Sequence, residues 1–255
     1  MWLGPNFSPD KTKRGKTIVS LVPSLTELLF DLGLGQLIIG RTKFCLHPAQ
    51  EIKQIQVVGG TKNIQIEKVR MLKPDIIIAN KEENTREDVE ALSVFSHVYL
   101  TDISNVPNLI TCIQQWIEFF PEADGHGLMQ SLSLLDFSGI FPPMNVAYLI
   151  WYNPLMTIGH DTFIHYMLTM SGLQNIFREK TRYPETSVHE VAKLKPDVIF
   201  LSSEPFPFSA KHQKELEKFL PSTRIVLVDG EMFSWYGSRI LSAPAYFRQL
   251  AGKLT

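Results

Sequence analysis

The sequence predicts an α/β fold of two lobes, each with a mostly parallel sheet, bridged by a single helix. Three observations lead to this prediction. A segment of helix, turn and strand occurs twice, the strands within it are apolar throughout, and a stretch without strand signals separates the two copies. Alternating strands and helices are typical of α/β domains, and apolar strands are typical of parallel sheets covered on both faces.

The repeat is clearest around two Lys-Pro-Asp turns. Residues 66–79 read IEKVRMLKPDIIIA and residues 188–201 read VHEVAKLKPDVIFL, so Pro196 follows Pro74 by 122 residues. Each helix is expected to end before its proline, because proline lacks an N–H and disfavours the helical conformation of the preceding residue. The apolar run after each turn then predicts a buried strand.

A strand and a helix precede each copy. In the first half we expect a strand over 17–22 and a helix ending at Asp31, with Ser24 and Glu27 as a capping box. In the second half we expect the strand over 145–151 and the helix over 161–170. Residues 98–100 and 224–228 predict a further strand in each half.

Residues 106–137 between the two copies show helical periodicity only, with Pro121 as a break. We predict helices over 108–120 and from 122 to about 137. The expected organisation is an N-terminal α/β lobe over 1–121, a linking backbone helix over 122–140 and a C-terminal α/β lobe over 141–255. Loops at the carboxyl ends of the strands would then face a cleft between the lobes, where a ligand is expected.

The composition narrows the possible functions. The formal net charge is −1 and 44% of the residues are hydrophobic, which argues against a nucleic-acid partner because such a partner requires a basic face. No apolar run approaches the roughly 18 residues of a membrane span, and residues 1–16 lack the apolar core of a signal peptide. Cys45 and Cys112 are expected to be buried free thiols, although a single bridge between them is the alternative.

The predicted strand-end loops carry aromatic and charged residues. Aromatic side chains suit a flat or bulky organic ligand, and lysine or arginine suits its acidic groups. The alternative for each aromatic residue is that it covers a hydrophobic core. The ligand-binding candidates in these loops are Ser24, Lys43, Phe44, Asn80, Lys81, Trp151, Tyr152, Glu204, Phe206, Trp235, Tyr236 and Arg239.

Signals for catalysis are poor, and we expect a protein that is not an enzyme and needs no cofactor and no metal. The chain contains neither a Gly-x-Ser-x-Gly elbow nor a phosphate-binding loop of the Gly-x-x-x-x-Gly-Lys type. A weaker alternative is a metal-ion carrier that uses Cys45, His47 and His160. Glu82 and Glu83 are read as a solvated helix start, or else as part of the rim of the cleft.

Several segments together resemble a known family. PSLTELLFDLGL, GGTKN, IEKVRMLKPDIII, the mid-chain helix and HEVAKLKPDVIFL are similar to the helical-backbone (class III) periplasmic-binding proteins, the substrate-binding components of ABC importers for cobalamin, haem and ferric siderophores. The resemblance implies two Rossmann-like lobes bridged by one long helix. It also implies a small metal-chelate ligand, a permease partner, a monomeric state and an extracytoplasmic location, with membrane contact only through the transporter or an anchor.

The same resemblance suggests roles for further residues. Phe44, Trp151 and Tyr183 fall near positions that are aromatic in cobalamin-binding members, whereas Thr61 and Asn80 occupy other such positions here. Family members dock on the permease through one acidic residue per lobe.

In this chain the first docking position matches Glu67, and the second holds His189, with Glu190 beside it. The rival hypothesis is a cytosolic enzyme or sensor of a corrinoid or tetrapyrrole on the same scaffold.

Overall fold

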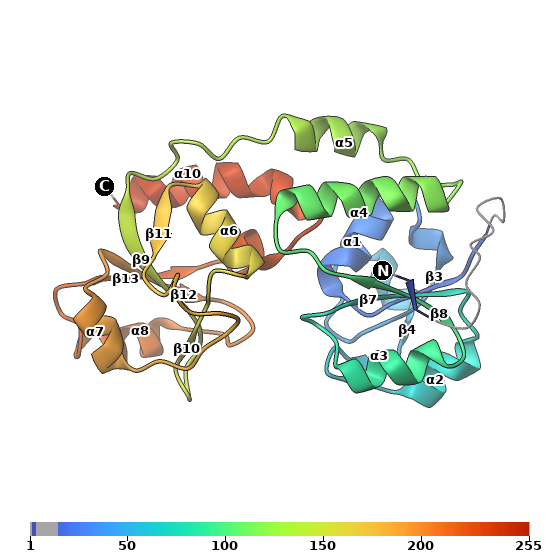
Figure 1. Cartoon of the computed structure of the whole chain (residues 1–255), viewed down its shortest axis with the longest axis horizontal. Helices are drawn as coiled ribbons and strands as arrows, with labels where there is room; N and C mark the ends of the chain where they lie inside the picture. The colour runs from blue at the N-terminus through green and yellow to red at the C-terminus, as the bar shows by residue number, and fades with distance from the viewer. Residues whose placement is uncertain (1, 4–14, 255) are drawn as a thin grey trace. The chain divides into compact units, whose positions relative to one another are not determined.

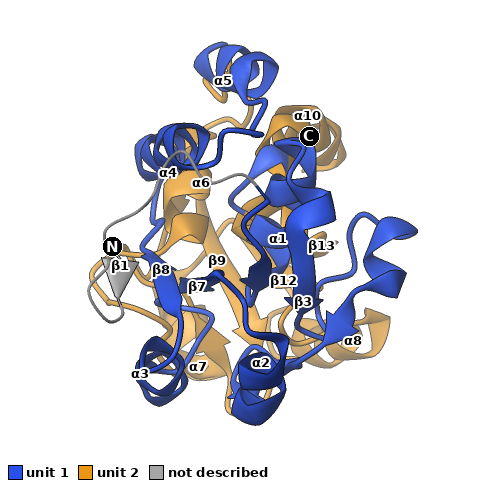
Figure 2. Ribbon diagram, turned by 90° about the vertical axis from the view of Figure 1, so that its right-hand side faces the viewer, with its two compact units in different colours: residues 1–134, 236–238 blue, residues 135–235, 239–255 orange. Residues whose placement is uncertain are grey.

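The computed structural model describes residues 2–3 and 15–254, which form two compact units (Figure 2). Unit 1 comprises residues 1–134 and 236–238, and unit 2 comprises residues 135–235 and 239–255. Most of residues 1–16, the segment predicted to lack a signal-peptide core, therefore lies outside the described residues. No helix in the described part of the chain is long and apolar enough to span a bilayer.

Unit 1 contains a sheet in the order β1-β8-β7-β2-β3-β4. The edge strand β1 runs antiparallel to β8, and the other neighbouring strands are parallel. A separate hairpin, β5 (Gly59–Gly60) with β6 (Asn63–Ile64), follows the other edge. The strands of the sheet are β1 (Trp2–Leu3), β2 (Ile18–Ser20), β3 (Ile38–Arg41), β4 (Gln56–Val57), β7 (Ile76–Asn80) and β8 (His97–Thr101).

Helices cover both faces of this sheet, with α2 and α3 on one face and α1 and α4 on the other (Figures 1 and 2). Thr85 and Asn105 cap α3 and α4, because their side-chain oxygens accept from the backbone N–H three residues on. The helices of unit 1 are α1 (Pro23–Asp31), α2 (Ile66–Leu72), α3 (Arg86–Ser93), α4 (Val106–Phe119) and α5 (His126–Ser133), with 3₁₀ turns at Gly35–Leu37 and Glu51–Gln54.

Unit 2 repeats this plan. The long strand β9 pairs in parallel with β12 and β11, β12 pairs in parallel with β13, and β10 folds back on β9. The faces are covered by α7 and α8 on one side and by α6 and α10 on the other (Figure 1). The elements are β9 (Met144–Trp151), β10 (Met156–Thr157), α6 (Phe163–Met170), β11 (Leu173–Asn175), α7 (Val188–Leu194), β12 (Val198–Ser202), α8 (Ala210–Glu217), β13 (Arg224–Val228), α9 (Glu231–Ser234), a 3₁₀ turn at Ser238–Ser242 and α10 (Ala243–Leu254).

The internal repeat is confirmed residue by residue. Helix α7 and strand β12 begin and end 122 residues after α2 and β7. Both helices end at a lysine in the left-handed conformation, Lys73 with φ 50° and Lys195 with φ 49°. This conformation turns the chain sharply into the proline and then into the strand. The predicted fold class, α/β with mostly parallel sheets, is therefore correct.

Each core follows the alternation of side chains along the strands. In unit 2, Ala147, Leu149 and Leu201 face one side, where they pack with residues of α7 and α8. Tyr148 and Phe200 face the other side, within a group of rings that includes Phe233 and Phe247. These strands are buried on both faces, as the uninterrupted apolar runs predict.

Two local predictions are wrong. Ser24 does not cap α1, because Pro23 already occupies the first helical position and the cap residue is Val22, so Ser24 lies inside the helix. The linking helix predicted over 122–140 is limited to His126–Ser133, and residues 134–143 are not helical. An Asx turn, in which Asp136 accepts from the backbone of Ser138, and Gly139 at φ 64° end the helical path.

Candidate functional site

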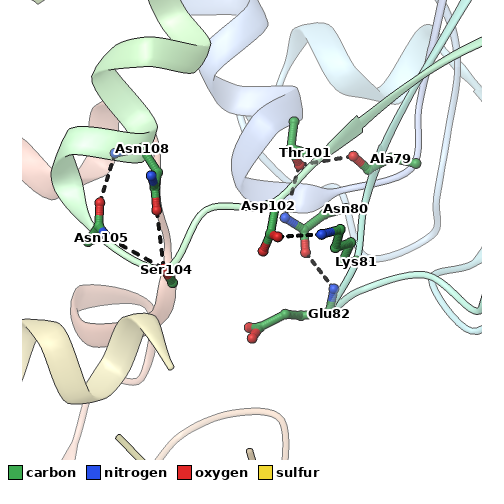
Figure 3. Close-up of polar contacts among 9 residues, drawn as sticks. All are labelled: Ala79, Asn80, Lys81, Glu82, Thr101, Asp102, Ser104, Asn105 and Asn108. Carbon is green, nitrogen blue, oxygen red and sulfur yellow. Dashed lines mark hydrogen bonds and ion pairs between the residues drawn. The ribbon is translucent and has the colours of Figure 1, made fainter. Parts of the chain in front are cut away.

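Parallel strands bring the loops after β2, β3, β7 and β8 to one edge of the unit 1 sheet. Asn80, the last residue of β7, organises this edge (Figure 3). Its side chain donates to Thr101 Oγ1 at 2.9 Å and accepts from the backbone N–H of Glu82 at 2.8 Å. Asn84 closes the loop by accepting from the backbone N–H of Asn80 and donating to the carbonyl of Thr61 at 3.0 Å. The loop after β7 is therefore held rigidly at the sheet edge.

Charged groups surround this loop. Lys81 forms an ion pair with Asp102, which follows β8, and the side chains of both are well exposed (Figure 3). Lys62 of the β5–β6 hairpin donates to the carbonyl of Glu82. Burial raises the pKa of the Glu83 carboxyl, an effect that nearby Lys62 opposes and Glu82 reinforces. The reading of Glu82 and Glu83 as a solvated helix start is therefore wrong for Glu83, which is partly withdrawn from water.

The loop after β3 carries the most exposed aromatic candidate. The ring of Phe44 is half exposed, and Lys43 Nζ lies 5.0 Å from its centroid. Gly60 of the hairpin lies beneath this ring, and a Cβ at Gly60 would come within 3.3 Å of it. Phe44, Lys43 and the neighbouring Thr61 thus form an accessible surface with both apolar and cationic character.

Three predicted ligand-binding residues are buried. Ser24, Asn80 and Tyr236 are 6%, 0% and 3% exposed. Asn80 uses its amide to hold the loop, and Ser24 lies under the segment 236–238, where a Cβ on Gly237 would come within 3.0 Å of its carbonyl oxygen. Asn80 thus supports the loop around it, and direct contact of these three residues with a ligand stays a prediction.

In unit 2, an aromatic cluster lies where β9 and β12 end. Trp151 packs edge-on against Phe206 at 5.6 Å, and Tyr152 stacks on Phe206 at 6.0 Å between ring centroids. Two residues that sequence reasoning missed complete it: Phe208, and His212 of α8, whose ring lies 4.8 Å from that of Tyr152. Trp151 remains 38% exposed, so the cluster presents an indole to solvent on a packed aromatic base.

The hydroxyl of Tyr152 orients this cluster. It donates to Glu215 Oε2 of α8 at 2.5 Å. That hydrogen bond raises the pKa of Tyr152 and lowers the pKa of Glu215. Glu215 was not singled out from the sequence, because its distance along the chain from Tyr152 gives no local signal of the contact.

A polar group lies at the ends of β12 and β13. Glu204 accepts a hydrogen bond from Ser234, and Arg239 pairs with Glu231 Oε2 at 3.0 Å while its guanidinium lies 4.8 Å from the Trp235 ring centroid. The two loops are in close contact, since a Cβ on Gly230 would fall 2.4 Å from Ser202 Oγ.

Tyr183, half-buried, belongs to a segment beside β10, where Pro184 accepts from the N–H of Thr157. This segment borders the carboxyl end of β9, because β10 pairs with Leu149 and Trp151. The predicted candidates of unit 2 are thus held by the three loops that follow β9, β12 and β13 and by this border segment.

Both cysteines are buried free thiols, as predicted. Burial raises the pKa of Cys45, although hydrogen bonds with Thr26 and Thr42 oppose the shift. Cys45 is thus poorly suited to act as a thiolate ligand. Among the described residues no three His, Cys, Asp or Glu side chains form a group able to hold a metal ion, so the structure gives the metal-ion carrier no support.

The two predicted docking acids differ in their surroundings. Glu67, in the first turn of α2, is 77% exposed and pairs with Arg70 of the same helix. Glu190 instead accepts from Lys180 Nζ at 2.6 Å and from Thr186 Oγ1 at 2.8 Å. Its side chain is therefore already engaged within unit 2, where the contact with Lys180 lowers the pKa of Glu190.

This architecture, two α/β units of the same topology with rigid strand-end loops, is that of a periplasmic solute-binding protein. Residues 18–114 match the family model described as periplasmic binding protein. The periplasmic vitamin B12-binding protein of Vibrio cholerae has the same fold, with a TM-score of 0.78 at 21% identity over 94% of this chain and 97% of that one.

Curated relatives agree with this assignment. An ABC transporter substrate-binding lipoprotein of Bacillus subtilis is 30% identical over 73% of this chain, and the match spans 63% of that relative's length. The vitamin B12-binding protein of Pectobacterium carotovorum is 25% identical over 93% of this chain and 88% of the relative. In sequence and in fold, the chain is therefore similar to the periplasmic binding proteins. These relatives do not support the cytosolic enzyme or sensor considered as a rival hypothesis.

Proposed function

We propose that this chain is the solute-binding protein of an ABC importer, and that it binds a metal chelate and delivers it to the permease without chemistry of its own. The observation that carries the proposal is the aromatic cluster of Trp151, Tyr152 and Phe206, which is packed at its base and exposed at the indole. Such a platform suits the flat face of a macrocyclic chelate. The vitamin B12-binding relatives support a ligand of this kind.

Each unit, taken by itself, offers candidate ligand contacts in its strand-end loops. In unit 1, Phe44 offers an exposed ring and Thr61 and Lys43 offer polar groups beside it. In unit 2, Trp235, Tyr183 and Glu204 are half-buried residues of the loop after β13, the segment beside β10 and the loop after β12. Because hydrogen bonds and close packing fix these loops, little ordering accompanies binding, which favours affinity.

A titration screen of the purified chain tests this function. Cyanocobalamin, cobinamide, haem and a ferric hydroxamate siderophore are added separately, and binding is followed by calorimetry, with tryptophan quenching as a second readout. We expect at least one chelate to bind with a micromolar or lower Kd.

Replacement of Trp151 by alanine should then weaken binding about 10-fold or more. Phe219→Ala is the matched control, because Phe219 is also exposed, at 69%, but follows the end of α8. If none of the chelates binds, the proposed function is contradicted. If Trp151→Ala and Phe219→Ala reduce the chelate affinity equally, Trp151 is not part of the site.

We further propose that the protein acts outside the cytoplasmic membrane as a monomer and docks on the permease through Glu67. The support is the exposure of this carboxylate at the start of α2, where the helix dipole favours negative charge. Glu190 is proposed as a weaker second contact, since Lys180 already neutralises it.

Chelate uptake by cells that carry the cognate transporter tests the docking role. Glu67→Lys should reduce uptake while chelate binding by the purified protein is unchanged. Glu87→Lys is the control, because Glu87 is an exposed first-turn glutamate of the neighbouring helix α3. Full uptake by the Glu67 variant, or an equal loss in the control, would contradict docking through Glu67.

A further inference from the structure

Two of the three cationic residues predicted to bind acidic groups of a ligand, Arg239 and Lys81, already have carboxylate partners within the protein. In unit 2, Arg239 Nη1 lies 3.0 Å from Glu231 Oε2, and both side chains are largely buried, at 18% and 26% exposure. The stacked Trp235 ring holds the guanidinium from another direction. Partial burial strengthens such a pair, because less water screens it. An anionic group on a ligand would therefore have to compete with Glu231 for Arg239.

The same relationship occurs in unit 1. Lys81, which follows β7, pairs with Asp102, which follows β8 (Figure 3). In both units a cation at the strand-end edge is thus matched by a carboxylate from a nearby segment of the same unit. The unit 1 pair is more exposed and correspondingly weaker.

The charge at the ends of β12 and β13 is negative overall. Glu204 follows β12, Asp229 and Glu231 follow β13, and Arg239 is the cation that pairs with Glu231. Glu204 accepts from Ser234 and Asp229 accepts from the backbone N–H of Glu231, so both carboxylates lie on the same loops as the Glu231–Arg239 pair. Like charges repel across short distances in partly desolvated surroundings, so a ligand that brings carboxylates to these loops is disfavoured.

We propose that Glu231 is a specificity-determining residue: by pairing with Arg239 it makes the site select an uncharged or cationic, amide-bearing chelate over a chelate that carries carboxylates. The proposal rests on the proposed function and names the ligand class for that same site. The Glu231 carboxylate would repel a carboxylate-bearing chelate, which would have to displace Glu231 from Arg239 in order to bind.

The test compares two macrocyclic metal chelates of opposite charge character. Cyanocobalamin has no net charge and carries amide side chains, whereas haem carries two propionate carboxylates. We expect the wild-type protein to bind cyanocobalamin about 10-fold or more tightly than haem. Glu231→Gln should release Arg239 and raise the haem affinity by about 3- to 10-fold, with the cyanocobalamin affinity changed by less than about 3-fold.

Two further measurements separate this role from a structural one. Arg239→Gln leaves Glu231 without its cation, so haem binding should become weaker than in the wild type, in the direction opposite to Glu231→Gln. The preference for cyanocobalamin should shrink as ionic strength rises, because salt screens the repulsion. The control is Glu179→Gln, which removes an exposed pair with Arg178 outside these loops and should leave the ratio unchanged.

The outcomes distinguish the two proposals. Tighter binding of haem than of cyanocobalamin by the wild type, or an unchanged affinity ratio in both Glu231→Gln and Arg239→Gln, overturns the role of Glu231 and leaves the chelate-binding function in place. Binding of neither probe, nor of the other chelates in the screen, overturns the proposed function and with it the inference.

Discussion

Asp75 and Asp197 fix the same strand junction in the two units. Asp75 Oδ2 accepts from the backbone N–H of Thr17 at 2.9 Å, just before β2, and Asp197 Oδ2 accepts from the backbone N–H of Asn145 at 2.7 Å, at the start of β9. In each unit the aspartate of the Lys-Pro-Asp turn thereby aligns the central strand with its neighbour. This shared contact gives a physical reason for an acidic residue at both turns.

Loss of this contact should destabilise unit 1. Asp75 also accepts from Thr17 Oγ1 at 2.9 Å, and hydrogen bonds to a charged acceptor contribute about 1.5–3 kcal/mol. Asp75→Ala is therefore expected to lower the free energy of unfolding by about 2 kcal/mol, measured by urea denaturation. Asp124→Asn, at an exposed site, is the control; an equal effect there would show that the contact with Thr17 is unimportant.

The left-handed lysines should be sites where glycine stabilises the protein. Lys73 and Lys195 have φ of 50° and 49°, a region that a Cβ disfavours and glycine adopts freely. We expect Lys73→Gly and Lys195→Gly each to raise the unfolding free energy by about 0.5–1 kcal/mol, seen as a higher Tm. Lys73→Ala keeps the Cβ and should not raise it. Glycine variants that melt at or below the wild-type temperature would refute this expectation.

The contacts of Glu190 predict a pH-dependent contribution to stability. Lys180 and Thr186 lower the pKa of Glu190 in the folded protein. A lowered folded-state pKa means that the contribution is present above the unfolded-state value of about 4.3 and is lost as the pH falls through the folded-state value. Because the pair is more than a third exposed, we expect Glu190→Gln to cost only about 0.5–1 kcal/mol at pH 7.

That cost should shrink as the pH falls below the ordinary glutamate pKa and disappear below the lowered pKa of folded Glu190. Denaturant titrations of the wild type and Glu190→Gln at neutral and acidic pH measure it. A difference between the two proteins that persisted in acid, or that grew, would argue against the ion pair as its source.

Two glycines should respond to alanine in opposite directions. At Gly230 a Cβ would approach Ser202 Oγ to 2.4 Å and Glu204 Cγ to 2.6 Å, so the loops after β12 and β13 would have to separate. Gly230→Ala is expected to cost about 1–3 kcal/mol and to weaken chelate binding. Gly127 in α5 has no atoms within 4 Å of an added Cβ, and Gly127→Ala should stabilise the protein by up to about 1 kcal/mol. Equal thermal shifts in both variants would contradict this account.

The sequence was most informative where local chemistry and hydrophobic periodicity agreed. The two Lys-Pro-Asp segments predicted a helix, a turn and a buried strand at the correct places, because proline ends a helix and apolar runs suit parallel strands. Capping was less predictable. A Ser24 cap requires the helix to begin after Ser24, but the helix begins at Pro23. The connecting helix is shorter than predicted, because a turn at Asp136 follows it.

The site was predictable in composition and less so in contacts. Trp151, Tyr152 and Phe206 could be placed at strand ends from the strand pattern alone. Their carboxylate neighbours could not be predicted in this way. Glu231, Asp102 and Glu215 contact Arg239, Lys81 and Tyr152 only through the tertiary fold, and Arg239 and Lys81 were expected to bind a ligand instead. Nor does any periodicity distinguish the buried Asn80 from its exposed neighbour Lys81.

The central claim is that a chelate binds at the aromatic cluster of Trp151, Tyr152 and Phe206. Hydrogen–deuterium exchange with and without saturating cyanocobalamin tests it most directly, because backbone amides in a covered loop exchange more slowly. We predict slower exchange at residues 151–154 and 203–208, with α5 unaffected. Unchanged exchange in these two loops, or an equal slowing in α5, would contradict the claim.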